Sequence, residues 1–164
     1  MTDVRHRNRS DRRAFTVVEL LIVIAIVAVI MLISLPYLFG RRNTGDLKNT
    51  AAQIATLLRQ AQSASMAQKQ GMSWGVHFQN STTTMPFYAL FSSAYGASST
   101  VGYYPLPGTV AYDTSTLAAG SSLDVIFSQV SGLASASTSI GLYLTSDPSI
   151  RSVISVASSG AVSF

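Results

Sequence analysis

Glu19 places a carboxylate inside the most apolar stretch of the chain, residues 15–39 (FTVVELLIVIAIVAVIMLISLPYLF). Every residue from Leu20 to Ile33 is apolar. On insertion scales a carboxylate at the centre of a membrane helix costs roughly 2.5–3.5 kcal/mol, so such a residue usually has a partner or a function. The carboxylate either neutralises a nearby cation or is an interfacial acid that bends toward water. Glu19 is therefore the first candidate functional residue.

The other ionisable residues form no recognisable catalytic pattern. The two histidines are His6 and His77, the latter on the predicted polar face of a strand, and the chain has no cysteine. No HExxH, GxSxG, P-loop or GxGxxG motif is present. Three aspartates, Asp113, Asp124 and Asp147, lack metal-ligand spacing and are interpreted as turn or strand-edge residues. We therefore expect no enzyme activity, no cofactor and no bound metal.

Aromatic residues of the second half of the chain offer a different chemistry. Trp74, Tyr95, Tyr103 and Tyr104 could present a stacking surface for nucleic acid or sugar. The alternative, which we favour, is that these rings pack in the core and under loops.

The element that positions Glu19 is an apolar helix preceded by a basic leader. All faces of residues 15–39 are apolar, and about 20 such residues span a bilayer, so we predict a transmembrane helix. Residues 1–14 hold five arginines against two aspartates, a net of +3, whereas six basic and five acidic residues give the remainder +1. By the positive-inside rule the N-terminus is cytoplasmic and residues after 39 are extracytoplasmic.

Three interpretations of this N-terminus compete. A secretory signal peptide would have a shorter apolar core followed by a small-residue cleavage site. A twin-arginine signal is suggested by Arg12 and Arg13, although the apolar run is too long for one. The third interpretation is cleavage between the leader and the apolar segment, which would leave the helix in the mature chain.

The third interpretation agrees with a family resemblance. Residues 14–21 (AFTVVELL) resemble the class III signal of type IV prepilins and pseudopilins. In that family a prepilin peptidase cuts before a Phe and methylates the new amine, which implies cleavage between Ala14 and Phe15. Glu19 then takes the family's signature acid at the fifth mature position, and Pro36 falls where many pilins carry a proline. The residue before the cut is usually Gly, and here it is Ala14.

Cleavage at this point would give Glu19 a partner. The α-amino group of Phe15 would be a cation at the head of an apolar helix, and a carboxylate one turn later can neutralise it. The pair forms either within one subunit or between neighbouring helices that are staggered. In the second case it sets the register of the assembly.

After the membrane segment the pattern changes twice. Residues 40–70 continue as an amphipathic helix to about Gln70, with a kink or short melted segment expected at Pro36 and Gly71 as a C-terminal cap. Arg41 and Arg42 are interpreted as an interfacial anchor. From residue 71 the period is two, and eight strands are predicted: residues 72–79, 87–91, 101–104, 109–112, 123–130, 140–144, 153–156 and 161–164.

The expected fold class is α+β, with a long N-terminal helix packed on an antiparallel β-sheet domain, as in the pilin-like fold. Its expected parts are a leader (1–14), an assembly helix (15–39), an amphipathic continuation (40–70) and a β-rich domain (71–164). Three segments are similar to the GspH/FimT group of minor pseudopilins: residues 47–71, the strand after them, and the ending at residues 151–162. That group commonly has a Gly-Arg pair at its final turn, and here Ala161 follows Gly160.

The resemblance implies a minor pilin or pseudopilin of the bacterial inner membrane that enters a type IV pilus or a type II secretion pseudopilus. The implied partners are other pilin subunits, the prepilin peptidase and membrane lipid. The alternative is a tip-located adhesin or a DNA-uptake pilin, although binding of nucleic acid has no support in the sequence. An enzyme on an uncleaved anchor would need a cleft with convergent polar groups.

Overall fold

The computed structural model describes residues 16–164, with side chains for 16–31 and 43–164. The chain divides into two units, Met1–Phe39 and Gly40–Phe164. The protein is α+β, with one long helix, α1 (Val17–Met66), and eight strands that follow a short 3-10 helix, η1 (Lys69–Gly71). The helical backbone of α1 includes Pro36, so the short melted segment expected there is not observed.

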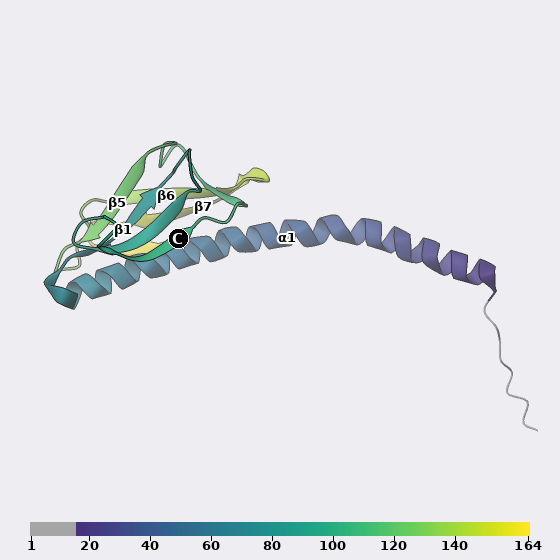
Figure 1. Cartoon of the computed structure of the whole chain (residues 1–164), viewed down its shortest axis with the longest axis horizontal. Coiled ribbons are helices and arrows are strands. Elements are labelled where there is room, and N and C mark those ends of the chain that lie inside the picture. The colour runs from purple at the N-terminus through teal and green to yellow at the C-terminus, as the bar shows by residue number, and fades with distance from the viewer. Residues whose placement is uncertain (1–15) are drawn as a thin grey trace, which may run out of the picture. The chain divides into compact units, whose positions relative to one another are not determined.

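The second half of α1 has one buried face, and Figure 1 shows the strands gathered on this part of the helix. The spacing of three and four residues between its apolar positions brings them to one side of a helix. Six positions with this spacing in the predicted amphipathic helix are buried: Leu47, Ala51, Ile54, Leu58, Ala61 and Ser65.

The helix ends four residues earlier than predicted. Gln68 and Gln70 have φ of 49° and 61°, which is left-handed backbone that cannot continue an α-helix. Gly71, expected to cap α1, has a φ of +65° and instead closes the short helix η1. The reversal directs the chain back along α1 into the first strand, where the Ser65 hydroxyl accepts the backbone N–H of Trp74 at 2.7 Å.

The strands form two antiparallel sheets. The first sheet has the order β3-β2-β1-β5 and the second the order β4-β6-β7-β8. Their bounds are Trp74–Gln79 (β1), Phe87–Ser92 (β2), Thr100–Pro105 (β3), Val110–Tyr112 (β4), Ser122–Phe127 (β5), Thr138–Leu144 (β6), Asp147–Val156 (β7) and Val162–Ser163 (β8). All eight predicted strands are confirmed, with ends that differ by at most three residues except at β7, which begins six residues earlier than predicted. The expected antiparallel β-sheet domain consists of two sheets, since β5 pairs with β1 in the first and β4 pairs with β6 in the second.

One hydrophobic core joins α1 to both sheets. Ile54 and Leu58 of the helix, Val76 and Phe78 of β1 and Ile140 of β6 are each fully buried in it. Fully burying one such side chain contributes roughly 1.5–3 kcal/mol, so this contact fixes the second half of α1 against the β domain.

The last strand closes the domain against the helix. The Arg59 guanidinium of α1 donates to the Val162 carbonyl at 3.0 Å and lies over the Phe164 ring. The turn before β8 also lies close to α1. Its Gly160, with a φ of +86°, lies against the Gln62 side chain and the Gly132 carbonyl. A Cβ at Gly160 would lie 2.2 Å from each of those groups, so only glycine fits.

Candidate functional site

The start of α1 is capped by residues of the predicted signal. The Thr16 hydroxyl accepts the backbone N–H of Glu19 at 3.2 Å, and the Thr16 carbonyl accepts that of Leu20 at 3.2 Å. Thr16 is thus the N-cap, and Glu19 lies at the third helical position. A negative charge there also interacts favourably with the helix dipole. Our reading of the sequence missed this second role, although the Thr-x-x-Glu spacing of a capping box was visible in it.

The described part of α1 before residue 32 is apolar on all sides and exposed. Its large side chains are between 43% and 75% exposed within the chain: Val17, Val18, Leu20, Leu21, Ile22, Val23, Ile24, Ile26, Val27, Val29, Ile30 and Met31. Soluble monomers rarely expose a continuous apolar surface of this kind, which marks an interaction site. Glu19 is the acid of its first turn.

Among the described residues, no helix has both the length and the apolar character needed to cross a membrane. Ala14 and Phe15, the predicted cleavage site, lie outside the described residues. The side chains of Pro36, Arg41 and Arg42 lie outside them as well. Of the predicted site residues, Glu19 alone is therefore described in full.

The β domain brings together a second group of polar and aromatic residues around His77. Its Nδ1 donates to Asp124 Oδ1 of β5 at 2.5 Å. The Tyr95 ring, from the loop after β2, stacks on the imidazole with centroids 3.5 Å apart and planes 1° apart. His77 lies on the side of β1 opposite the core residues Val76 and Phe78, as predicted, but it is only 4% exposed because the Tyr95 ring covers it. Its Nε2 has no hydrogen-bond partner within the described part of the chain.

The four aromatic residues considered as a stacking surface divide into two pairs. Trp74 is buried in the core and donates its indole N–H to the Lys69 carbonyl, and Tyr104 stacks on Tyr88 beside the core. Core packing is thus confirmed for these two residues. Tyr95 and Tyr103 instead keep exposed ring surface on the outer side of the first sheet.

The other two aspartates stabilise turns. Asp113 Oδ1 accepts the backbone N–H and the hydroxyl of Ser115, and Oδ2 pairs with Arg151 of β7. The Ser115 bonds, followed by the Arg151 guanidinium, hold the pKa of Asp113 below its usual value. Asp147 accepts the same two groups of Ser149, which lowers its pKa as well. The interpretation as turn or strand-edge residues is confirmed for both, since Asp113 begins a turn and Asp147 is the first residue of β7.

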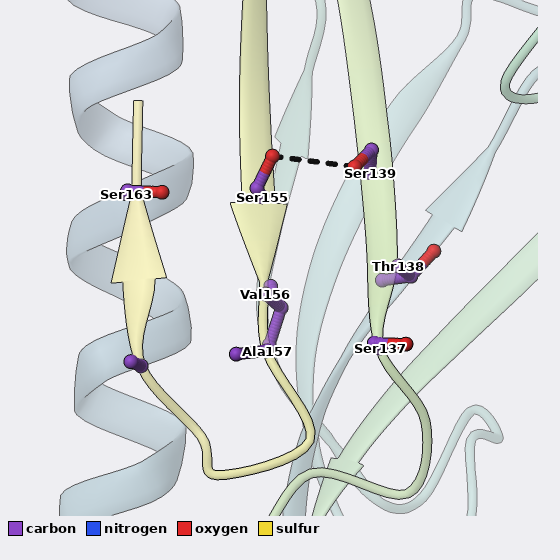
Figure 2. Close-up of a pocket in the computed structure, with 8 residues that line it drawn as sticks. Ser137, Thr138, Ser139, Ser155, Val156, Ala157 and Ser163 are labelled. Carbon is purple, nitrogen blue, oxygen red and sulfur yellow. Dashed lines mark hydrogen bonds between the residues drawn. The ribbon is translucent and has the colours of Figure 1, made fainter.

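A hollow of about 430 Å³ lies at one end of the second sheet, between β6, β7 and β8. Figure 2 shows hydroxyl groups along it, with Ser139 and Ser155 joined by a hydrogen bond of 3.2 Å. Its lining includes no charged side chain, so it has no fixed charge with which to select an ionic ligand. The lining residues are Ser137, Thr138, Ser139, Ser155, Val156, Ala157, Ala161 and Ser163.

The architecture defines a class: an α+β protein whose long helix is packed on antiparallel sheets over its second half and has an exposed apolar start. Residues 9–35 match the family model described as the Prokaryotic N-terminal methylation motif. This motif is the type IV pilin and pseudopilin signal, so residues 9–35 are similar to the N-terminus of a pilin-like precursor. Such precursors are processed by prepilin peptidase and assemble with other pilins. No curated protein and no solved structure matches the chain.

Proposed function

We propose that the chain is a minor pilin or pseudopilin subunit, held in the bacterial inner membrane before it enters a filament. The filament is a type IV pilus or the pseudopilus of a type II secretion system. The main support for this proposal is that the methylation motif at residues 9–35 includes the exposed apolar start of α1. A surface of this composition is stable in contact with lipid or with like helices and unstable in water.

The proposed topology follows from charge. The N-terminus lies in the cytoplasm, residues 15–39 cross the membrane once, and the β domain lies on the extracytoplasmic side. The peptidase cuts between Ala14 and Phe15 and methylates the Phe15 amine. Pro36 and Glu19 then belong to the helix that leaves the lipid and packs against other subunits. We assign the protein an assembly function without a catalytic reaction.

The proposed subgroup is GspH/FimT. Support comes from the order of the elements: the amphipathic half of α1, a first strand directly after it, and a final hairpin of β7 and β8. Gly160 lies in the turn of that hairpin. Arginine, which the group commonly has next, is replaced by Ala161. This replacement weakens the alternative of a DNA-uptake pilin, because the turn lacks the basic side chain.

The test follows the protein through processing. Full-length protein is expressed in cells with and without prepilin peptidase and traced with an antibody against the β domain. We expect an inner-membrane form that, with peptidase, begins at N-methylated Phe15 and crosslinks to other pilin subunits. Recovery of an unprocessed form from the soluble fraction of peptidase-positive cells would contradict the proposal.

A further inference from the structure

The outer side of the first sheet carries a row of residues contributed by all four strands. Cross-strand pairing aligns His77 of β1 with Ala89 of β2, Tyr103 of β3 and Asp124 of β5. Alternate residues of a strand point to opposite sides of a sheet. Because Val76 and Phe78 of β1 point into the core, this row faces away from it. The row therefore forms a second side of the sheet, opposite the core.

Aromatic rings form a continuous run across that outer side. Tyr95 stacks on His77, His77 lies 5.8 Å from Phe87, and Phe87 lies 4.6 Å from Tyr103, measured between ring centroids. The two ends of the run are open, since Tyr95 is 38% exposed and Tyr103 55% exposed. Each end offers an aromatic surface to a ligand.

The charge beside these rings is negative. The Asp124 side chain is 41% exposed and holds His77 through one oxygen. Burial, followed by the neighbouring Tyr103 and Asp124, raises the pKa of Tyr95. Residues 70–150 contain no lysine or arginine. Arg151 is paired with Asp113. The face is thus an aromatic surface with one acid, Asp124, which is paired with His77, and the strands that form it contribute no lysine or arginine.

We propose that this outer face of β1, β2, β3 and β5 binds a cationic side chain, an arginine or lysine presented by a partner protein. The faces of tyrosine rings attract cations, and a guanidinium both stacks on a ring and pairs with a carboxylate. A nucleic acid brings phosphates, which Asp124 would repel. A sugar needs several fixed polar groups that converge, whereas the exposed polar groups here are the Asp124 carboxylate and two tyrosine hydroxyls, since His77 is only 4% exposed. The chain uses the same chemistry internally, where Lys69 lies over Trp74 and Arg59 over Phe164.

The test uses the full chain in a polyoxyethylene detergent, which carries neither sugar nor choline, with isotope-labelled tyrosine and histidine rings. NMR titrations compare a capped Gly-Arg-Gly peptide with its citrulline counterpart, which has nearly the same shape and no charge. We expect saturable shifts at Tyr95, Tyr103 and His77 with the arginine peptide. The citrulline peptide should bind about tenfold or more weakly.

Variants separate the charge from the rings. Asp124→Asn and Tyr103→Leu should each weaken binding of the arginine peptide about tenfold. Asp147→Asn removes an exposed carboxylate of the second sheet and should leave binding unchanged. Asp124 also holds His77, so Tyr103→Leu, which leaves that bond intact, keeps the test decisive if the Asn variant alters the fold.

Several results would overturn the proposal. Equal binding of the citrulline peptide, or no shift at high millimolar concentrations of the arginine peptide, would show that the face does not bind a cationic side chain. Tighter binding of a thymidine oligonucleotide or of a cello-oligosaccharide at the same rings would assign the face to another class of ligand. Saturation by choline at a lower concentration than by the arginine peptide would assign it to a lipid headgroup.

Discussion

The Thr16 hydroxyl accepts the backbone N–H of Glu19 at 3.2 Å, so the acid of the pilin-like signal lies in the capping turn of α1. Glutamine can occupy the third helical position of a capping box as glutamate does. The charge of Glu19 can therefore be removed without removing a side chain suited to the cap. This separates the effect of the carboxylate on assembly from its effect on the helix.

Glu19→Gln should keep its membrane location, its cleavage and its β fold, and should lose incorporation into filaments. The reason is that the Phe15 amine of a neighbouring subunit would find no counter-ion at the required height. Protein level, processing and presence in sheared filaments, compared with wild type, measure this effect. Normal incorporation of the variant would show that Glu19 is an interfacial acid without a role in assembly. A helix that serves only as a membrane anchor tolerates the neutral residue.

Thr16→Ala is the matched control for the helix cap. It removes the hydroxyl that accepts the Glu19 N–H and keeps the carboxylate. Loss of an N-cap costs about 1 kcal/mol. We expect some fraying of the first turn and retained incorporation. If Thr16→Ala assembled as poorly as Glu19→Gln, the cap and not the charge would explain the defect.

Ala14→Gly should raise the fraction of protein that is cleaved before Phe15. Glycine is the usual residue at this position of the signal that residues 14–21 resemble, and a smaller residue leaves the peptidase unobstructed. Mass spectrometry of the N-terminus in peptidase-positive cells gives the processed fraction. A chain that still began at Met1 or Thr2 in both forms would refute cleavage at this boundary.

Gly160→Ala should destabilise the β domain by about 2 kcal/mol or more, because the new Cβ meets Gln62 and the Gly132 carbonyl at a positive φ. Gly120→Ala is the control, since Gly120 has a φ of +78° but no atom within 4 Å of the added Cβ. It should cost about 1 kcal/mol from the backbone alone. Urea unfolding monitored by Trp74 fluorescence measures both changes, and equal costs would show that the close contact is relieved at no expense.

A chain beginning at Gly40 should be soluble and folded. The unit Gly40–Phe164 contains the buried face of α1 and both sheets, and it omits the exposed apolar start of the helix. Size-exclusion chromatography with circular dichroism and a cooperative melt measures this. Aggregation without detergent would show that the sheets need a partner subunit.

The β domain should lose stability between about pH 10 and 12. Burial, followed by the nearby Tyr104, raises the pKa of Tyr88 to about 12, and burial also raises the pKa of Tyr112. An unfolded tyrosine ionises near pH 10. As pH rises, the unfolded chain therefore loses these protons before the folded domain does. The contribution of the two hydroxyls to stability is fully present below about pH 10 and decreases as pH rises toward the pKa of the folded state.

Tyr88→Phe and Tyr112→Phe should reduce this alkaline loss, and Tyr103→Phe, at an exposed side chain, is the control. The free energy of unfolding in urea at pH 8, 10 and 11 measures the slope for each variant. Tyr88→Phe also loses the bond to Gln53, so its stability at pH 8 is lower from the start. An unchanged slope in both buried variants would remove these hydroxyls as the cause.

The sequence predicts those features of the fold that depend on local pattern. Period-two alternation located every strand, and helical spacing located the buried face of α1 from Leu47 to Ser65. The end of α1 was missed because glutamines at 68 and 70 adopt left-handed backbone, which their residue type does not announce. The division into two sheets was missed because the pairing of β1 with β5 joins residues far apart in the chain.

The candidate site divides in the same way. Glu19 could be identified from its sequence because a carboxylate stands out in an apolar run. The face around His77 could not, because a histidine between strand residues looks solvated until Tyr95, eighteen positions later, is found stacked on it. Local sequence patterns show which residues belong to a helix or strand, whereas the packing of loops determines which polar groups are buried.

The contact between Arg59 and the Val162 carbonyl has a consequence for the order of folding. It joins residues 103 positions apart, and Gly160 contacts Gln62 over a similar interval. Contacts this distant in sequence form late, because the intervening chain loses most of its freedom first. The contact cannot form before residue 162 has been made, so the domain reaches its final stability only after that point.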